Sequence, residues 1–444
     1  DFMIDELQTE DGGFARYSTD AIWLVPHFEK MLYDNALLAH CYLEAHRATG
    51  EAAYAEVASR TLDFMIDELQ TEDGGFASAL DADSEGREGA YYVWTREELL
   101  AALESGGLGS DEAERVASYW DVTAEGSWEG SNVLHVAAEA PAPPLLERAR
   151  AALLQVRSLR PRPSRDEKQL ASWNGLAIRA LAAGALLDDG YRFGVAARRA
   201  IDFVRSRLLR DGDRLWRTSR GGRSHTPAFC SDYADLADGL LATHAALGDG
   251  GDLLLARALV ERAIADFWDD ASGTFFDAGS EHETTIARPR SLLDDATPSA
   301  NSVMADLLQR LALLTGDEDL DRRARAILRA VAPALERQPS AFGRMLAAAD
   351  RALDPPVDAV VAVPGRGDPA GAALRRAVAA PYAPNLVIGS VEPGSELETW
   401  PLFAEKVARG GAATAYVCRG YACEEPTTDP ERARRQVEGL AAPR

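Results

Sequence analysis

One short stretch, VPHFEKMLYDN over residues 25–35, gathers an unusually dense set of groups that can move protons. The set consists of an imidazole, two carboxylates, an ammonium, a phenol and an amide, supplied by His27, Glu29, Lys30, Tyr33, Asp34 and Asn35. This mixture suits general acid–base catalysis, in which one positioned group gives a proton and another takes one. A helix beginning at Pro26 would place His27, Lys30 and Asp34 on one face, at positions i, i+3 and i+7. The alternative is a buried salt-bridge network that locks helices together.

Four more stretches bring polar or aromatic side chains to the openings of helices or to nearby turns. They are ALDADSEG with Asp81 and Asp83, SWNGL with Trp173 and Asn174, CSDYADL with Asp232 and Tyr233, and RSLLDDATPSANS with Asp295 and Asn301. In this prediction His27 is a catalytic acid or base, and its complementary group is Asp34, Asp81 or Asp232.

The remaining residues of these stretches are predicted to hold a substrate. Glu29, Lys30, Tyr33, Asn35, Asp83, Asn174, Asp295 and Asn301 would bind its polar groups, and Trp173 and Tyr233 would stack on a sugar ring. Each stretch also has a purely structural interpretation. Asp81 fits a solvated turn, Trp173 a helical core, and Asp232 and Asp295 the cap of a helix.

Metals and cofactors are not predicted. Asp81, Asp83 and Glu85 could hold a divalent cation through oxygen atoms, but the spacing and the terminal glutamate of an EF-hand are lacking. The Walker loop, the H-E-x-x-H zinc motif, the dinucleotide fingerprint and the G-x-S-x-G elbow are absent from the sequence. We therefore expect chemistry carried by side chains alone.

The cysteines are few and scattered, at Cys41, Cys230, Cys418 and Cys423. The last two have no second pair to complete a zinc site, and we interpret them as ordinary buried thiols. Such cysteine usage favours a reducing cytoplasm.

Charge and composition narrow the class of partner. The chain has 444 residues, 46% of them hydrophobic and 27% charged, which is typical of a globular protein. Its net charge is −24, which disfavours nucleic acid and anionic membrane surfaces as partners. No uncharged apolar run is long enough to span a bilayer. The expected partner is a small molecule.

The elements that must position these residues recur at intervals of about sixty residues. The segment DFMIDELQTEDGGFA occurs identically at residues 1–15 and 63–77, which indicates a recent duplication, an engineered one or an assembly artefact. Helices apolar nearly all round are predicted near His27, Gln169, Ser231 and Thr297. Each is followed by a turn and a more charged helix.

Stacked helical hairpins of this kind predict an α/α toroid, in which the apolar helices form the inner ring. The toroid would span residues 1–354, with an irregular insertion at 81–165 that holds a hairpin or strand followed by short helices. From residue 355 to 444 the pattern becomes strand, helix, strand and strand, a small α/β appendage. The fold class is therefore mainly α.

Six strings of the sequence resemble, in order, the thioredoxin-domain proteins of the spermatogenesis-associated protein 20 type. They are LVPHFEKMLYDNALLA, DADSEGREGAYYVWT, GSWEGSNVLH, RPSRDEKQLASWNGLAI, RPRSLLDDATPSANS and AYVCRGYACEEPTTDP. The resemblance runs from about Gly12 to the C-terminus. It implies a six-hairpin α/α barrel similar to sugar epimerases and glycosidases, which in the family follows a thioredoxin-like domain. We expect that domain and the first barrel hairpin to be missing here, with DELQTEDGGFARYS replacing a glycine-rich lead-in.

Three functions follow from these patterns. The first is a carbohydrate-active enzyme, a sugar epimerase, isomerase or glycosidase, that works by acid–base catalysis in the toroid cavity. The second is a ligand-binding or regulatory module without catalysis, and the third is a structural scaffold. A fold alone does not decide between them.

Overall fold

The computed structural model describes residues 4, 7–283, 286–420 and 422–441. Its backbone forms two compact units. The first contains Asp1–Ala39, Glu56–Gln70 and Ala77–Glu167, and the second contains His40–Ala55, Thr71–Phe76 and Lys168–Arg444. The helices α1 (Leu32–Thr49) and α2 (Ala52–Phe64) each contribute residues to both units.

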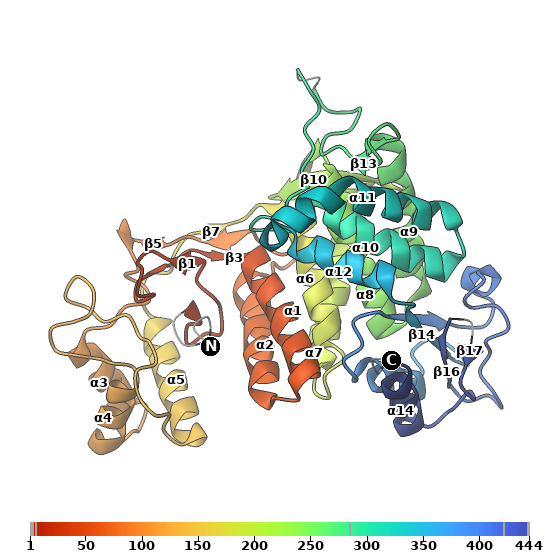
Figure 1. The fold of residues 1–444 in the computed structure, drawn as a ribbon. Coiled ribbons are helices and arrows are strands. Elements are labelled where there is room, and N and C mark those ends of the chain that lie inside the picture. Colours follow the sequence, from red (N-terminus) through yellow and green to blue (C-terminus); the bar gives the residue numbers. More distant parts are fainter. Residues whose placement is uncertain (1–3, 5–6, 284–285, 421, 442–444) are drawn as a thin grey trace. The chain divides into compact units, whose positions relative to one another are not determined.

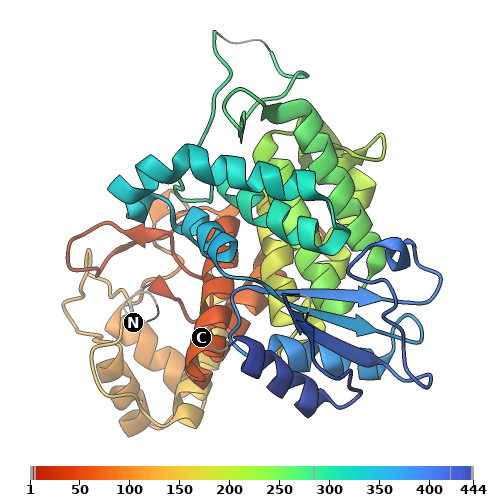
Figure 2. The ribbon, with the colours of Figure 1, turned by 45° about the vertical axis from the view of Figure 1, so that its right-hand side comes forward.

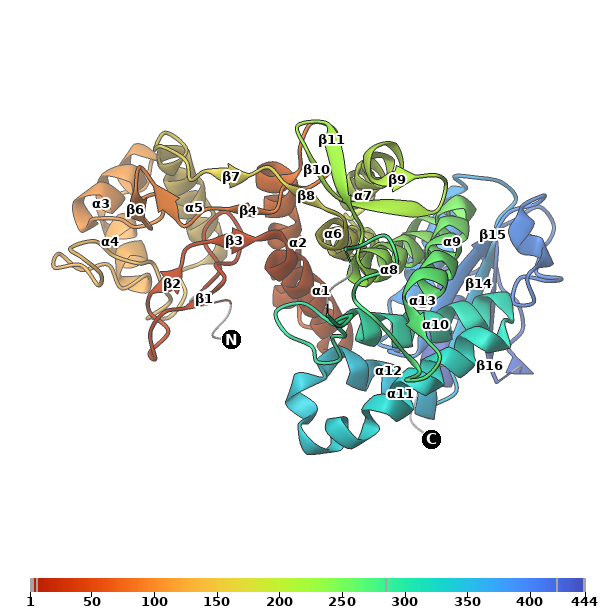
Figure 3. The same ribbon diagram turned by 90° about the horizontal axis from the view of Figure 1, so that it is seen from above.

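The second unit consists mainly of helical hairpins, each with one buried and one more polar helix. The buried helices are α6 (Ala171–Gly184), α8 (Cys230–Leu247) and α10 (Ala300–Thr315). They pack in chain order, α6 on α8 and α8 on α10, and Figure 3 views α6 and α8 close to end-on. Their partners α7 (Tyr191–Phe203), α9 (Gly250–Phe267) and α11 (Glu318–Arg337) cover them in turn, and α12 (Gly343–Leu353) packs on α10 (Figure 1). The predicted α/α-toroid class is confirmed.

Two glycines explain why α6 and α8 pack so closely. A Cβ atom on Gly175 would lie 2.4 Å from the backbone of Asp235, and one on Gly239 would lie 2.6 Å from the carbonyl oxygen of Gly175. Since these distances are shorter than any real Cβ contact, only glycine allows the two helices to approach to backbone contact.

Short strands connect the hairpins of the second unit. They are β8 (Gln169–Leu170), β9 (Leu209–Arg210), β10 (Arg214–Arg220), β11 (Arg223–Pro227), β12 (Trp268–Asp269) and β13 (Thr274–Phe275). Strand β10 pairs antiparallel with β8, β9 and β11, and β12 pairs with β13. Strand β8 leads directly into α6, and the other strands lead the chain from an outer helix to the next inner one.

The predicted α/β appendage forms a four-stranded sheet in the order β15-β14-β16-β17. Its strands are β14 (Val357–Ala362), β15 (Leu386–Val391), β16 (Thr414–Arg419) and β17 (Ala422–Cys423). Strand β14 is parallel to β15 and antiparallel to β16. Helices α13 (Pro369–Ala379) and α14 (Pro430–Ala441) pack against the sheet, as the blue elements of Figure 2 show.

This sheet corrects the prediction for the last two cysteines. Cys418 and Cys423 form a disulfide rather than two thiols. The reason is the register of β16 and β17, which sets Cys418 directly opposite Cys423. A four-residue gap in the sequence gives no sign of this pairing.

The first unit holds the insertion predicted at 81–165, with its hairpin and its short helices. The helices α3 (Arg96–Ser105), α4 (Ser110–Tyr119) and α5 (Pro143–Arg157) pack around one apolar core. The strands are β1 (Tyr17–Ser18), β2 (Pro26–His27), β3 (Lys30–Met31), β4 (Ala79–Leu80), β5 (Asp83–Ser84), β6 (Arg87–Glu88) and β7 (Arg165–Asp166). Strand β1 pairs with β2, β5 with β6, and β4 lies between β3 and β7.

The two copies of the repeated segment form the same turn against equivalent helices. Gly12 has a φ of +88°, and a Cβ atom there would lie 2.5 Å from the carbonyl oxygen of Arg60 in α2. Gly74 has a φ of +96°, and its Cβ would lie 2.5 Å from the carbonyl oxygen of Arg199 in α7. Each turn therefore requires glycine for its dihedral angle and for its close approach. The helix end predicted before the first turn falls partly on residues 1–3 and 5–6, outside the described residues.

Among the residues that the structure describes, no helix is both long enough and apolar enough to cross a membrane.

Candidate active site

The predicted helix from Pro26 is wrong, because two short strands precede α1. His27 lies in β2 and pairs with Tyr17, and Lys30 lies in β3 and pairs with Leu80. The strand pairing takes the place of a first helical turn, and α1 begins only at Leu32. His27, Lys30 and Asp34 therefore do not share a helical face.

His27 and its neighbours nevertheless form a continuous polar cluster within the first unit. The Nδ1 atom of His27 lies 2.9 Å from Oε1 of Glu88, and its Nε2 atom lies 3.6 Å from Oε2 of Glu29. The imidazole stacks on the ring of Tyr17 at 5.1 Å between centroids. One ring nitrogen is thus held by a carboxylate while the other faces a second carboxylate, an arrangement that orients an imidazole for proton transfer.

Arg16 extends this cluster to Asp34. Its Nη1 atom lies 3.4 Å from Oε2 of Glu29, and its Nε atom lies 3.9 Å from Oδ2 of Asp34. Its guanidinium also lies over the ring of Tyr33, 5.8 Å from the centroid. We call Arg16, His27, Glu29, Asp34 and Glu88 the acid–base cluster.

Asp34 is the member whose titration is most strongly altered. Its side chain is 19% exposed, and its Oδ2 atom accepts no hydrogen bond from the residues that the structure describes. Burial raises the pKa of Asp34 to about 7, the Arg16 guanidinium opposes this rise, and the Glu29 carboxylate adds to it. Asp34 can therefore hold or release a proton near neutral pH.

Lys30 is engaged in a separate buried ion cluster. Its Nζ atom lies 2.8 and 2.9 Å from the two carboxylate oxygens of Asp11 and also donates to the hydroxyl of Thr9. Arg157 reaches the same Asp11 carboxylate at 2.7 Å. Although burial acts to raise it, these two cations hold the pKa of Asp11 well below its usual range. The ammonium is fully paired here, which favours a structural role for Lys30.

The three predicted asparagines share one backbone-binding arrangement, which we call the Asn–Phe latch. In each case the amide Oδ1 accepts from the N–H of a phenylalanine, and Nδ2 donates to the carbonyl of that phenylalanine. The pairs are Asn35 with Phe14, Asn174 with Phe76 and Asn301 with Phe275, at 2.7–3.2 Å. Nδ2 also donates to a second carbonyl, that of Met31, Leu170 or Ser291 respectively. The amides thus fasten the turn before each inner helix to its first residues, which leaves little capacity for a substrate.

Asp232 and Tyr233 lie buried at the start of α8, within the second unit. The Asp232 carboxylate accepts from the N–H of Phe229 at 2.8 Å and from that of Ser172 at 3.1 Å. The hydroxyl of Tyr233 accepts from the N–H of Leu215 at 3.1 Å. Burial raises the pKa of Asp232, while Arg217 and the two N–H groups oppose the rise. Its contacts are those of a residue that ties the starts of α6 and α8 together.

The other predicted residues lie nearer the surface. Asp81 and Asp83 are exposed, and Asp81 accepts from the N–H of Asp83 and from the hydroxyl of Ser164. Asp295 is exposed in the loop before α10, and Trp173 is half-buried in the first turn of α6. Asp81 and Asp83 belong to the same compact unit as the acid–base cluster, whereas Trp173, Asp232 and Asp295 belong to the other.

Two members of the cluster were not singled out in the sequence. Arg16 follows the first glycine turn, and Glu88 follows a tight turn in the 81–165 insertion. The pairing of β1 with β2 brings Arg16 beside Glu29, because Arg16 directly precedes β1. The strings GGFARY and SEGREG hold these charges, but neither string has a spacing that indicates contact with His27.

Comparison with known proteins gives close relatives by sequence. No protein-family model matches the chain. The chain is 35% identical over 465 residues to spermatogenesis-associated protein 20 of Homo sapiens. The aligned region covers 94% of this chain and 59% of the human protein. The protein of the same name from Mus musculus is 33% identical over 468 residues, covering 94% of this chain and 58% of the mouse protein. The chain thus spans less than two thirds of these relatives.

Solved structures similar to the chain include cellobiose 2-epimerase from Bacillus thermoamylovorans. The match has 9% sequence identity and a TM-score of 0.49, and it covers 74% of this chain and 68% of the epimerase. The family indicated by the six motifs is confirmed by the sequence relatives. Over the part of those proteins that it spans, this chain is a relative of spermatogenesis-associated protein 20.

Proposed function

We propose that this chain carries the acid–base site of a carbohydrate-active enzyme, a sugar epimerase, isomerase or glycosidase. The observation that supports the proposal most directly is the largely buried carboxyl group of Asp34, 3.9 Å from Arg16 in the cluster that also holds His27, where burial raises the pKa of Asp34 to about 7. A group that is half protonated at neutral pH can serve as acid or base with little cost in free energy.

The proposed roles follow from the contacts of the cluster. Glu88 holds Nδ1 of His27 and thereby leaves Nε2 to exchange a proton, the role that the third member of a catalytic triad plays for its histidine. Asp34 is the complementary acid or base, and Arg16 balances the charge of whichever carboxylate is ionised. Tyr17, 48% exposed and stacked on His27, offers an aromatic face to a sugar ring.

The proposed reaction can be tested with a panel of neutral monosaccharides and disaccharides in deuterated water. An epimerase or isomerase exchanges a carbon-bound proton with solvent, so deuterium appears in the sugar. A glycosidase cleaves the glycosidic bond and leaves the carbon-bound protons in place. Nuclear magnetic resonance of the sugars distinguishes these outcomes, and sugars that bind without any change would support the non-catalytic alternative.

The residues can be tested in the same assay with any sugar that is turned over. We expect His27→Ala and Asp34→Asn each to lower turnover by roughly 10²–10⁴-fold. Asp111→Asn is the matched control, because Asp111 also lies in the first turn of a helix of the first unit but is exposed. Full turnover in both cluster variants would contradict the proposal.

A further inference from the structure

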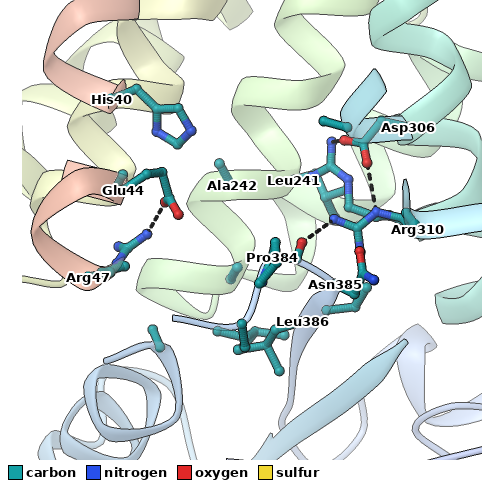
Figure 4. A pocket seen from close by; sticks show the side chains of 18 of the residues that line it. His40, Glu44, Arg47, Leu241, Ala242, Asp306, Arg310, Pro384, Asn385 and Leu386 are labelled. Carbon is teal, nitrogen blue, oxygen red and sulfur yellow. Dashed lines mark hydrogen bonds and ion pairs between the residues drawn. The ribbon is translucent and has the colours of Figure 1, made fainter. Parts of the chain in front are cut away.

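A cavity of about 400 Å³ lies within the second unit, and none of the residues that line it belongs to the acid–base cluster. Its lining comes from the later part of α1, from α6, α8, α10 and α12, and from the segment that leads into β15. Figure 4 shows His40 and Glu44 on one side and Asp306 and Arg310 on the other, with Pro384 and Leu386 below. The volume is typical of a site for a small organic molecule.

The cavity is rich in arginine. Arg179, Arg310, Arg344 and Arg351 line it, and their side chains are only 11–16% exposed. We call it the arginine cavity. Four largely buried guanidiniums require negative partners, since an uncompensated buried charge is strongly destabilising.

Among the residues that the structure describes, two carboxylates form ion pairs with these four cations. Asp306 contacts Arg310 at 2.9 Å, Arg344 at 2.8 Å and Arg351 at 2.7 Å. Asp238 contacts Arg344 at 3.1 Å and Arg179 at 3.4 Å, and it also pairs with Arg310. The four guanidiniums therefore exceed the two carboxylates by two positive charges.

The other ionisable groups near the cavity do not remove this excess. Glu44 is paired with Arg47. Burial, together with the negative charge of Asp238, raises the pKa of Asp235 well above its usual range, which disfavours the ionised form of this carboxyl group. Asp350 also lines the cavity, but it is exposed to solvent, where water and salt screen its charge.

Hydrogen-bond donors in the cavity also lack acceptors. Nη1 of Arg351, and Nε of both Arg310 and Arg344, are buried and have no hydrogen-bond partner in the described part of the chain. Nε2 of His40 lies 2.9 Å from Nη2 of Arg179 and must accept from it, so Nδ1 of His40 carries the proton. This Nδ1 atom also has no hydrogen-bond partner among the described residues. Burial and the Arg179 charge lower the pKa of His40 well below its usual range, which keeps the ring neutral. Buried donors of this kind are expected to meet an acceptor.

We propose that the arginine cavity binds a small phosphate monoester, with the phosphate on the arginines and its organic part against Leu241, Ala242 and Leu386. A phosphate monoester carries about −1.5 to −2 charges at neutral pH, which matches the excess of two. Its oxygens accept the paired hydrogen bonds that guanidinium groups donate. This site is separate from the acid–base cluster and does not depend on the proposed reaction.

Titration calorimetry of the full chain at low salt tests the site with three probes: glucose 6-phosphate, inorganic phosphate and glucose. We expect saturable one-to-one binding of the ester, at least tenfold weaker binding of inorganic phosphate, and no binding of glucose. Arg351→Gln should weaken ester binding about tenfold, whereas Arg322→Gln, the same change at an exposed arginine of α11, should leave it unchanged. Absence of ester binding, equal affinity for inorganic phosphate, or no effect of Arg351→Gln would overturn the proposal.

A second pair of variants is compared by unfolding temperature, a measurement that needs no ligand. It tests the charge of the cavity even if Arg351→Gln fails to fold. Ala242 lines the cavity from α8, so Ala242→Glu places a carboxylate there and Ala242→Gln a neutral group of the same size. We expect the glutamate variant to unfold at a higher temperature than the glutamine variant and to lose ester binding. A lower unfolding temperature for the glutamate variant would show that the cavity has no excess positive charge.

Discussion

The carboxylate of Asp34 lies 3.9 Å from the guanidinium of Arg16, yet its Oδ2 atom accepts no hydrogen bond from any described residue and its pKa rises to about 7. An arginine at this distance ordinarily lowers the pKa of a carboxyl group. Here the loss of water around Asp34 outweighs the attraction, and Glu29 competes for the same guanidinium. The burial of the Asp34 carboxylate therefore lowers the stability of the folded protein, as is common for residues at sites of proton transfer.

The pKa of Asp34 makes stability depend on pH. Between about pH 4 and about pH 7 the folded protein holds a proton on Asp34 that the unfolded chain releases, so this group's contribution to stability falls as the pH rises. Asp34→Asn should remove that slope and raise the free energy of unfolding at pH 8 by roughly 1–4 kcal/mol. Urea unfolding of both proteins from pH 4.5 to pH 8 measures the free energy of unfolding and its slope with pH, with Asp111→Asn as control. An unchanged slope in Asp34→Asn would show that Asp34 titrates normally.

The identical repeat provides a matched test of the buried ion cluster. Asp11 and Asp73 occupy the same position of the repeat, but Asp11 pairs with Lys30 and Arg157, whereas Asp73 accepts from the neutral Gln169. Asp11→Asn should cost about 3–5 kcal/mol, because it removes the carboxylate that pairs with the buried ammonium of Lys30, whereas Arg157 keeps its ion pair with Glu10. Asp73→Asn, which keeps an acceptor oxygen at an exposed position, should cost about 1 kcal/mol or less. Chemical denaturation compares the two, and equal costs would rule out a special role for the charge of Asp11.

The Asn–Phe latch should be a local source of stability. Asn174→Ala leaves the buried N–H and C=O of Phe76 without partners, at a cost of about 2–4 kcal/mol. Gln155→Ala removes an exposed amide from a helix and should change stability by no more than about 0.5 kcal/mol. Hydrogen exchange of the Phe76 amide gives a site-specific measurement. If the Phe76 amide is protected in Asn174→Ala as strongly as in the unsubstituted chain, the proposed stabilising role of the latch is refuted.

The glycine turns allow dihedral strain to be separated from close approach. Gly74 and Gly212 both have positive φ, +96° and +87°, but only at Gly74 would a Cβ atom meet a backbone oxygen, at 2.5 Å. Gly212→Ala should therefore cost about 1 kcal/mol. Gly74→Ala should cost at least about 1 kcal/mol more, because the turn must move away from α7. Thermal unfolding of both variants provides the comparison, and similar costs would mean that the turn moves easily.

The helical part of the fold could be predicted because its signal is local. The inner helices are apolar over most of their surface and the outer ones carry more charge, so their order is readable from the sequence. The two-residue strands around His27 and Lys30 have no such signal, since their pairing partners, Tyr17 and Leu80, come from elsewhere in the chain. The helix predicted from Pro26 failed for this reason.

The site was harder to predict than the fold for a related reason. The residue types around His27 were evident, but Glu88 reaches it from 61 positions away, and Asp34 depends on burial that a sequence does not display. The asparagines were conspicuous because they are polar residues in apolar helices. Their partners are backbone groups of the preceding turn, which no side-chain pattern reveals.

The three latches span very different lengths of chain. Phenylalanine and asparagine are 21 positions apart in the first, 98 in the second and 26 in the third, yet the hydrogen bonds are the same. Whatever lies between them can therefore grow or shrink while the following helix still begins at its proper place. These segments are therefore positions that tolerate insertions. A fold of this kind can gain new substructures there during evolution while its helical hairpins stay unchanged.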